Sequence, residues 1–404
     1  MFATAFLFTL ALAVAANPIV VVDRSPISLP LSRVRNFTSG YDIISHDLAR
    51  IQHFKDRANA RATNQPFTKR QAQPVINEVV SYIASVGVGA SNSQYQLIVD
   101  TGSSNTWVGA SKSFASTSTS TNTGAQVSVS YGSGEFSGTE WTDKVTLSSS
   151  LVVTQQSIGV ASSSSGFSGT DGILGIGPTD LTADTVNGAS TVPTVVDNLF
   201  SQGTISQKVI GISFAPTTTD EVTNGEIFFG GTDSAKFAGS VAYTPRVGDY
   251  WGIAQTVTYG STTVLNNLQG IVDTGTTLIY LTPNSFNSYI KATGAVFDDD
   301  TGLYKLTTAQ FSALKNLNFV IGGVAYSLTP NAQIFPRSLN TEIGGSASSI
   351  YLIVSDLGES LCAAEAGFDF INGYAFLERF YSVYDTTNNR VGFASTPFTT
   401  ATTN

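Results

Sequence analysis

The chain has almost no cysteine or histidine. Its 404 residues include one cysteine, Cys362, and two histidines, His46 and His53, which both precede residue 70. A single cysteine cannot form an intramolecular disulfide. Beyond residue 70 the lack of histidine excludes a Ser-His-Asp triad, a Cys-His pair and a histidine-ligated zinc site. Stability must therefore come from a large apolar core, and any chemistry must use other side chains.

Charged residues are also scarce, at 12% of the chain, and they are unevenly distributed. Residues 17–70 contain nine Lys and Arg against four Asp and Glu, whereas the rest of the chain contains 11 and 25. This change of sign predicts a basic propeptide, residues 17–70, that is removed at the dibasic pair Lys69-Arg70. The acidic body argues against a nucleic-acid partner and indicates tolerance of acid.

Long apolar runs are limited to the amino terminus. Residues 1–16 are almost entirely apolar and end in small residues, which predicts a secretory signal peptide. The run is too short to cross a membrane, and no later run is long enough. The sequence therefore predicts a secreted, extracellular protein that does not associate with a membrane.

The body from residue 71 is rich in Ser, Thr, Gly, Val and aromatic residues, arranged in short alternating runs between turn residues. This pattern predicts an all-β protein with helices confined to a few stretches, such as residues 192–202 and 283–292. About 330 residues are enough for two lobes. We expect the boundary near residue 240, which gives lobes of residues 71–240 and 241–404.

One short motif occurs twice. The segments 98–104 and 271–277 read IVDTGSS and IVDTGTT, so that Asp100 and Asp273 each follow an apolar run and precede a glycine. Each half of the body is expected to present one aspartate at the end of a buried strand. Packing of the two halves about an approximate two-fold axis would bring the two carboxylates together.

Two carboxylates at hydrogen-bond distance share one proton, because both cannot be ionised cheaply. The ionised member can then activate a water, while the protonated member polarises an amide carbonyl. Glycines allow the two turns to approach, and hydroxyls can orient the outer carboxylate oxygens. The residues expected to support the pair in this way are Thr101, Gly102, Ser103, Thr274, Gly275 and Thr276.

These motifs resemble those of the pepsin-like aspartic endopeptidases, and the resemblance extends over the whole body. It includes Tyr131-Gly-Ser-Gly, similar to the family's flap, and the segment 171–175, similar to the apolar segment behind the first active-site loop. The resemblance implies an all-β, bilobal fold of two related β-barrel-like lobes. A cleft would separate the lobes, and a β-hairpin flap would close over it.

The resemblance also implies roles for individual residues. Asp100 and Asp273 would be the catalytic pair that hydrolyses polypeptide substrates in acid, without a cofactor or metal. The protein would be a monomer made as a zymogen, with its own propeptide as an intramolecular inhibitor. Lys55 and Lys69 are the candidates for the propeptide residue that neutralises the pair. The flap and substrate-binding residues would be Tyr131, Gly132, Ser133, Ile173 and Trp107, the last as the hydrogen-bonding partner of Tyr131.

Three positions depart from the family pattern. Asn372 replaces an apolar residue and Tyr374 an acid in the second apolar segment, which puts that acid's contribution in doubt. Ser133 stands where some fungal members carry an aspartate and accept lysine before the scissile bond. The resemblance therefore implies that lysine is not accepted there, and the apolar character of Ile173 and its neighbours predicts a preference for apolar or aromatic side chains beside that bond.

A second reading is a catalytically inactive pepsin-like protein that binds peptides or glycans in its cleft. Inactive relatives lose an aspartate or a flap residue, whereas this chain retains Asp100, Asp273 and Tyr131. The intact site favours the enzyme.

Overall fold

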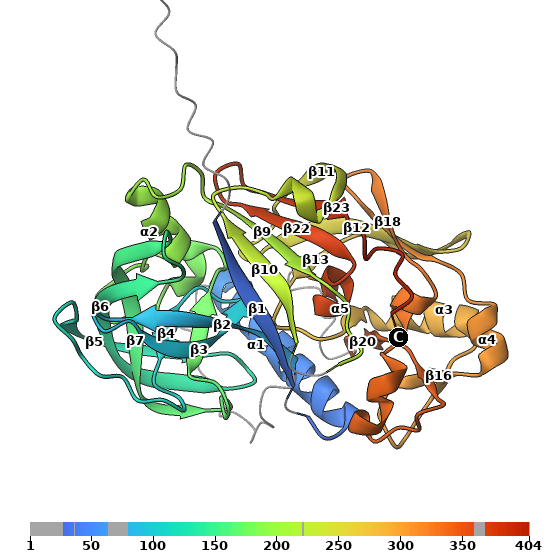
Figure 1. Cartoon of the computed structure of the whole chain (residues 1–404). Helices are drawn as coiled ribbons and strands as arrows, with labels where there is room; N and C mark the ends of the chain where they lie inside the picture. The colour runs from blue at the N-terminus through green and yellow to red at the C-terminus, as the bar shows by residue number, and fades with distance from the viewer. Residues whose placement is uncertain (1–26, 36, 64–79, 220–221, 359–367, 404) are drawn as a thin grey trace, which may run out of the picture.

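The structure is a computed structural model that describes residues 27–35, 37–63, 80–219, 222–358 and 368–403. Two strand-rich lobes lie side by side and are joined by one long sheet (Figure 1). The predicted all-β, bilobal architecture is confirmed. The predicted signal peptide, the dibasic pair Lys69-Arg70 and Cys362 lie outside the described residues.

The long sheet includes a strand from the predicted propeptide. This strand, β1 (Ile27–Arg35), lies between β10 (Thr223–Phe229) and β2 (Val80–Val88) and pairs antiparallel with both. The basic segment is therefore a central part of the fold rather than a peripheral arm. Within the described residues the order of the thirteen strands is β11 (Ala238–Pro245), β23 (Arg390–Ser395), β22 (Phe380–Asp385), β9 (Val209–Phe214), β10 (Thr223–Phe229), β1 (Ile27–Arg35), β2 (Val80–Val88), β3 (Ser93–Asp100), β8 (Gly172–Gly175), β4 (Thr106–Val108), β7 (Val152–Ser165), β6 (Glu135–Thr146) and β5 (Thr121–Ser130).

Two further sheets build the second lobe. In the part of the chain that the structure describes, the larger has the order β18 (Val324–Leu328), β17 (Leu317–Ile321), β12 (Gly252–Tyr259), β13 (Thr262–Val272), β21 (Phe370–Asn372), β14 (Ile279–Leu281) and β20 (Val354–Asp356). The smaller consists of β15 (Val296–Phe297), β16 (Tyr304–Leu306) and β19 (Ile350–Tyr351).

The two lobes repeat one arrangement around the repeated motif. Strand β3 pairs in parallel with β8, and β8 pairs antiparallel with β4. In the second lobe β13 pairs in parallel with β21, and β21 pairs antiparallel with β14. In each lobe the aspartate motif therefore connects two strands that both pair with the same third strand. The motif is enclosed by these three strands.

Helices α2 (Val195–Ser201) and α3 (Pro283–Thr293) confirm the two predicted helical segments. The short helices are α4 (Thr308–Ser312), α5 (Tyr374–Leu377) and the 3-10 turns η1 (Thr179–Thr182), η2 (Ser234–Lys236), η3 (Asn331–Gln333) and η4 (Arg337–Ile343).

The longest helix, α1 (Gly40–Ala62), was not predicted, because the propeptide was treated only as a basic segment. It begins at a capping box, in which Ser39 and Asp42 each bond the other's backbone N–H. Its buried face includes Ile43, Ile51 and Phe54 at helical spacing. The helix lies between the two lobes (Figure 1).

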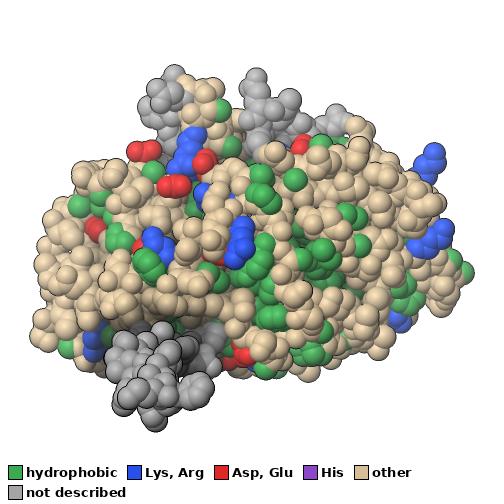
Figure 2. Space-filling model, turned by 90° about the horizontal axis from the view of Figure 1, so that it is seen from above, with side chains coloured by type: hydrophobic (Ala, Val, Ile, Leu, Met, Phe, Trp, Pro, Cys, Tyr) green, Lys and Arg blue, Asp and Glu red, His purple; other side chains and the backbone are tan. Residues whose placement is uncertain are grey.

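Charged side chains are sparse on the surface, as the composition requires, and uncharged atoms cover most of the face in Figure 2. One acid is nevertheless buried in the first lobe. Glu140 on β6 is 3% exposed and accepts a hydrogen bond from the Ser157 hydroxyl, while its Oε2 has no hydrogen-bond partner among the described residues. Burial raises the pKa of Glu140 to about 7.

Replacement of Glu140 by Gln should stabilise the protein at neutral pH. The pKa of Glu140 is higher in the folded than in the unfolded state, so stability is lost as the pH rises from about 4.5 towards about 7. Above that range the buried carboxylate costs on the order of 3 kcal/mol. Urea unfolding should show Glu140→Gln to be more stable than the wild type by about that amount at pH 8 and equal to it at pH 4.

The matched control is Asp300→Asn, which removes an exposed acid. This variant should unfold like the wild type at both pH values. A Glu140→Gln protein without any advantage at pH 8 would contradict the assignment of a buried, proton-holding carboxyl.

Candidate active site

The two aspartates occupy equivalent positions at the ends of β3 and β13. The backbone N–H of Ile176, directly after β8, donates to the carbonyl of Asp100 at 2.9 Å. In the second lobe the N–H of Asp273 donates to the carbonyl of Asn372, on β21, at 3.1 Å. Asp100 and Asp273 are 1% and 0% exposed. The strand behind each motif thus fixes the backbone that carries the carboxylate.

Reciprocal hydrogen bonds join the two motifs. The N–H of Thr101 donates to Oγ1 of Thr274 at 3.0 Å, and the N–H of Thr274 donates to Oγ1 of Thr101 at 2.9 Å. Oγ1 of Thr274 also donates to the carbonyl of Val99 at 3.0 Å. These bonds cross between the lobes and hold the two turns together.

Each carboxylate receives the same two kinds of hydrogen bond from its own turn. Asp100 accepts from the Gly102 N–H at 2.9 Å and from the Ser103 hydroxyl. Asp273 accepts from the Gly275 N–H at 3.2 Å and from the Thr276 hydroxyl at 2.6 Å. The expected supporting residues are therefore all brought together at the pair.

The glycines of the two motifs have no Cβ, which leaves room between the turns for the carboxylates and for Arg50. A Cβ at Gly102 would lie 2.6 Å from Oδ1 of Asp273, across the lobe interface. A Cβ at Gly275 would lie 2.6 Å from the guanidinium carbon of Arg50, a residue of α1. No larger residue fits at either position without displacing these groups.

Arg50 occupies the site. Its guanidinium donates to Asp273 from Nε at 2.7 Å and from Nη2 at 3.0 Å, and Nη2 also donates to Asp100. Of the two residues named as candidates for this position, Lys55 is not the one at the carboxylates, since its Nζ lies 5.4 Å from the ring centroid of Phe368. The other candidate, Lys69, lies outside the described residues.

Helical geometry explains this correction. Arg50 lies seven residues after Ile43 and four before Phe54, so it shares their buried face. A reading of residues 40–62 as a helix could have selected Arg50 from that spacing. A planar guanidinium can also bind two carboxylates at once, which an ammonium does less well.

Burial and charge act on the two carboxyl groups together. Burial raises the pKa of Asp100 above its usual value, while Arg50 opposes this shift and Asp273 adds to it. Burial would raise the pKa of Asp273 too, but Arg50 and the bonds from Thr276 and Gly275 hold it below its usual value. The pair is therefore arranged to keep one carboxylate ionised more readily than the other.

Helix α1 also binds the turn that carries the second motif. The carboxylate of Asp47 accepts hydrogen bonds from the N–H groups of Thr277 and Leu278, both at 3.0 Å. The ring of Phe54 packs against Tyr250 with a centroid distance of 4.7 Å. The helix thus contacts the body on both sides of Arg50.

The flap is a hairpin turn between β5 and β6. The N–H of Tyr131 donates to the carbonyl of Gly134 at 2.8 Å, and Gly132 has a φ of 78°. A Cβ at Gly132 would lie 2.2 Å from the carbonyl oxygen of Ala49 on α1. Ser133 is 2% exposed. This hairpin turn, the expected flap, therefore lies directly against α1, where Gly132 is needed for both conformation and contact.

The expected hydrogen bond between Trp107 and Tyr131 is absent. Among the described residues the buried Nε1 of Trp107 has no hydrogen-bond partner. The rings of Trp107 and Tyr131 instead both make edge contacts with Phe167, at centroid distances of 4.8 and 5.5 Å. Ile173 pairs with Ile98 and lies in the same apolar cluster, at 2% exposure. Both residues thus support the flap from within the core.

The departure at Asn372 is accommodated by a second amide. Asn372 Nδ2 donates to Oε1 of Gln255 at 2.8 Å, and Gln255 Nε2 donates to Oδ1 of Asn372 at 3.3 Å. The two side chains are 0% and 1% exposed. Sequence reasoning missed Gln255, because β12 lies more than 100 residues before Asn372. Each side-chain amide thus gives the other a hydrogen-bond partner, directly behind Asp273.

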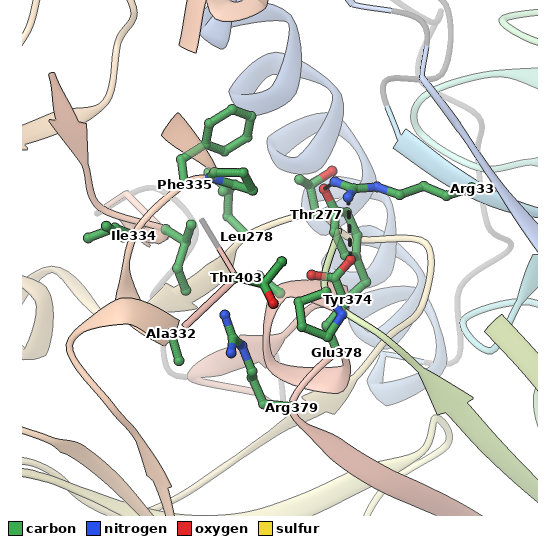
Figure 3. Close-up of a pocket in the computed structure, with 14 residues that line it drawn as sticks. Arg33, Thr277, Leu278, Ala332, Ile334, Phe335, Tyr374, Glu378, Arg379 and Thr403 are labelled. Carbon is green, nitrogen blue, oxygen red and sulfur yellow. Dashed lines mark hydrogen bonds and ion pairs between the residues drawn. The ribbon is translucent and has the colours of Figure 1, made fainter. Parts of the chain in front are cut away.

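The departure at Tyr374 serves the propeptide strand. Arg33 of β1 points toward Tyr374 and Glu378 across a pocket behind the second motif (Figure 3). Its Nη2 donates to the Tyr374 hydroxyl at 3.1 Å, and its Nη1 lies 3.6 Å from Oε1 of Glu378. The tyrosine that replaces an acid is therefore a hydrogen-bonding partner of the propeptide.

Comparison with known proteins identifies several similar chains. The sequence profile described as "Eukaryotic aspartyl protease" matches residues 81–396. The chain is 58% identical to polyporopepsin of Irpex lacteus over 339 residues, which cover 82% of this chain and 98% of that protein. It is 31% identical to rhizopuspepsin-2 of Rhizopus niveus, over 83% of this chain and 87% of that protein.

A solved structure is similar over nearly the whole chain. The crystal structure of aspartic proteinase from Irpex lacteus superposes with a TM-score of 0.79 at 51% sequence identity. The match covers 94% of this chain and 100% of that one. The likeness therefore extends to both lobes.

Loss of either amide in the Asn372–Gln255 pair should destabilise the protein. Asn372→Leu or Gln255→Leu leaves the other buried amide without its partner, which costs about 1–3 kcal/mol. The double variant should lose less stability than the sum of the two, because no amide is then left unsatisfied. Urea unfolding of the four proteins measures this coupling, and strictly additive losses would argue against a paired function.

Proposed function

The chain belongs to the eukaryotic aspartyl protease family, and from this premise we propose that it is made as a secreted zymogen whose catalytic residues are Asp100 and Asp273. It is an aspartic-type endopeptidase, a hydrolase of polypeptides. To this activity we add that the reaction takes place at acid pH, which residues catalyse it, and how the propeptide keeps the zymogen inactive. The observation that carries it is the binding of one guanidinium by both carboxylates, which requires that they face the same point.

After Arg50 departs, the same point can hold a water molecule. The ionised carboxylate accepts a proton from this water, and the protonated one donates a hydrogen bond to the carbonyl of the scissile peptide. The bonds from Ser103 and Thr276 fix the outer oxygens, so the carboxylates need not reorient during the reaction. Acid conditions maintain the required single shared proton.

The flap completes the site in this proposal. Tyr131, Gly132 and Ser133 close over a bound peptide, exclude bulk water and align the scissile bond. Trp107 and Ile173 act indirectly, since they belong to the apolar cluster that supports the hairpin. The pocket next to the scissile bond takes apolar or aromatic side chains, in keeping with the apolar cluster around Ile173.

The propeptide, residues 17–70, acts as an intramolecular inhibitor. Arg50 neutralises the two carboxylates, Asp47 binds the second turn, and β1 pairs with strands on both of its sides. We place the mature amino terminus near Gln71, after the dibasic pair. The mature monomer then consists of lobes of residues 71–240 and 241–404.

Secretion follows from the predicted signal peptide at residues 1–16. Within the described ranges, no helix combines the length and the apolar character that a bilayer crossing requires. The alternative of an inactive binding protein has no observation in its favour, because every expected residue of the catalytic pair and its support is retained.

The activity should disappear when one carboxylate is removed. The processed wild-type protein is expected to cleave an unfolded protein substrate at pH 3–5 and to be blocked by a statine-type inhibitor. Asp100→Ala and Asp273→Ala should each lower kcat by at least about 10³-fold, because neither remaining group can act alone as base and acid. Unchanged cleavage in either variant would refute the catalytic pair.

Removal of the propeptide cation should weaken latency. Breaking a buried ion pair from one side typically costs about 3–5 kcal/mol, so Arg50→Gln should release the helix from the cleft. The unprocessed Arg50→Gln chain is expected to cleave a peptide at pH 5–6, where the unprocessed wild type is silent. The matched variant Lys55→Gln should remain latent, and equal latency in all three proteins would exclude Arg50 as the blocking residue.

A further inference from the structure

Beyond the catalytic pair, helix α1 carries two more arginines against the body. The guanidinium of Arg57 donates from Nη2 to the carbonyls of Leu181 and Ala183, at 2.6 and 3.3 Å. Arg61 forms an ion pair with Asp249 at 2.7 Å and donates to the carbonyl of Asp180 at 2.7 Å. Two cations of the propeptide therefore lie on acceptors that belong to the body.

The acceptors come from two segments on opposite lobes. One is the turn η1 with its continuation to Asp184, and the other is the connection from β11 to β12, which contains Asp249 and Tyr250. Burial lowers the pKa of Arg57 and Arg61 lowers it further, whereas Tyr250, Asp249 and Asp184 act in the opposite direction. The net effect on the pKa of Arg57 is a lowering, so Tyr250, Asp249 and Asp184 offset only part of the cost of burying this cation.

Tyr250 provides an independent sign of a ligand. The residue is 7% exposed, yet its hydroxyl has no hydrogen-bond partner among the described residues. It lines one cavity together with Arg57, Leu181, Gly102 and Tyr131, so the cavity reaches from the catalytic motif and the flap to the arginine. A buried hydroxyl without a partner is costly, and a bound donor would relieve that cost.

We infer that Asp184, Asp249 and Tyr250, with the carbonyls of Leu181 and Ala183, form a subsite for a basic side chain of the peptide substrate. The inference rests on the proposed endopeptidase function and adds a substrate preference to it. In the zymogen Arg57 and Arg61 occupy this subsite. Their removal with the propeptide leaves carboxylates, carbonyls and a hydroxyl without a cation.

The body supplies no replacement for these arginines among its described residues near the subsite. Arg246 of the body reaches this segment through a hydrogen bond to the carbonyl of Asp249 that is 3.5 Å long. The guanidinium of Arg246 is held instead by Asn389 Oδ1 at 2.7 Å and lies over the ring of Trp251. A substrate side chain can therefore enter without displacing a cation of the mature chain.

The position of the subsite along a substrate follows from the helix. Arg57 and Arg61 lie seven and eleven residues beyond Arg50, which corresponds to about 10 and 16 Å along α1. An extended peptide covers such distances in about three to five residues. The subsite is thus remote from the scissile bond, and it is compatible with apolar side chains beside that bond.

Peptide cleavage by the processed enzyme tests this inference. In one reference peptide, each position from the second to the sixth on either side of the scissile bond is replaced in turn by Arg or by Gln. At one position the Arg peptide should be cleaved about five- to twentyfold faster in kcat/KM than its Gln counterpart, the effect of a partly buried charged hydrogen bond. This Arg-to-Gln ratio should fall towards one in Asp184→Asn/Asp249→Asn and decrease in Tyr250→Phe.

The control variant Asp299→Asn/Asp300→Asn removes two exposed acids on the loop after β15 and should keep the ratio of the wild type. The inference is overturned if no position favours Arg, or if the preference survives in Asp184→Asn/Asp249→Asn. Failure of the wild type to cleave even the Gln peptides would instead overturn the proposed function on which it rests.

Discussion

The reciprocal hydrogen bonds between Thr101 and Thr274 are the constraint on which the site depends. Each lobe can deliver an aspartate by itself, because each motif is enclosed by its own three strands. The bonds that cross between the turns hold the two carboxylates close to each other. In the proposed mechanism, the shared proton and the division into a base and an acid depend on that proximity.

The propeptide is matched to the same geometry. Its helix presents Arg50 to both carboxylates and Asp47 to the adjacent N–H groups, so that charges of each sign meet their complement. Its strand inserts Arg33 between Tyr374 and Glu378. This segment thus contacts the body through buried, directional bonds, and its net charge is opposite to that of the body. In the proposed zymogen, proton uptake by the carboxylates weakens these contacts and couples release to acid.

Buried polar groups in the body suit the same conditions. Glu140 keeps its proton up to about pH 7, so its burial costs little in acid. The amides of Asn372 and Gln255 satisfy each other and carry no charge at any pH. An interior of this kind is stable where few carboxylates are ionised, and it becomes less favourable as the pH rises.

The sequence by itself determined the fold class, the two aspartates and their hydroxyl and glycine supports, because alternating strands and sharp turns are local patterns. It also restricted the chemistry, since a body without histidine has few other ways to activate water. The tertiary structure decided which cation meets the carboxylates, what partners Asn372 has, and where the indole of Trp107 packs. The orientation of α1 about its axis places Arg50, and not Lys55, at the two carboxylates. Gln255 contacts Asn372 because strands far apart in the sequence lie in one sheet. Such contacts depend on packing between segments far apart in the chain, which no local pattern specifies.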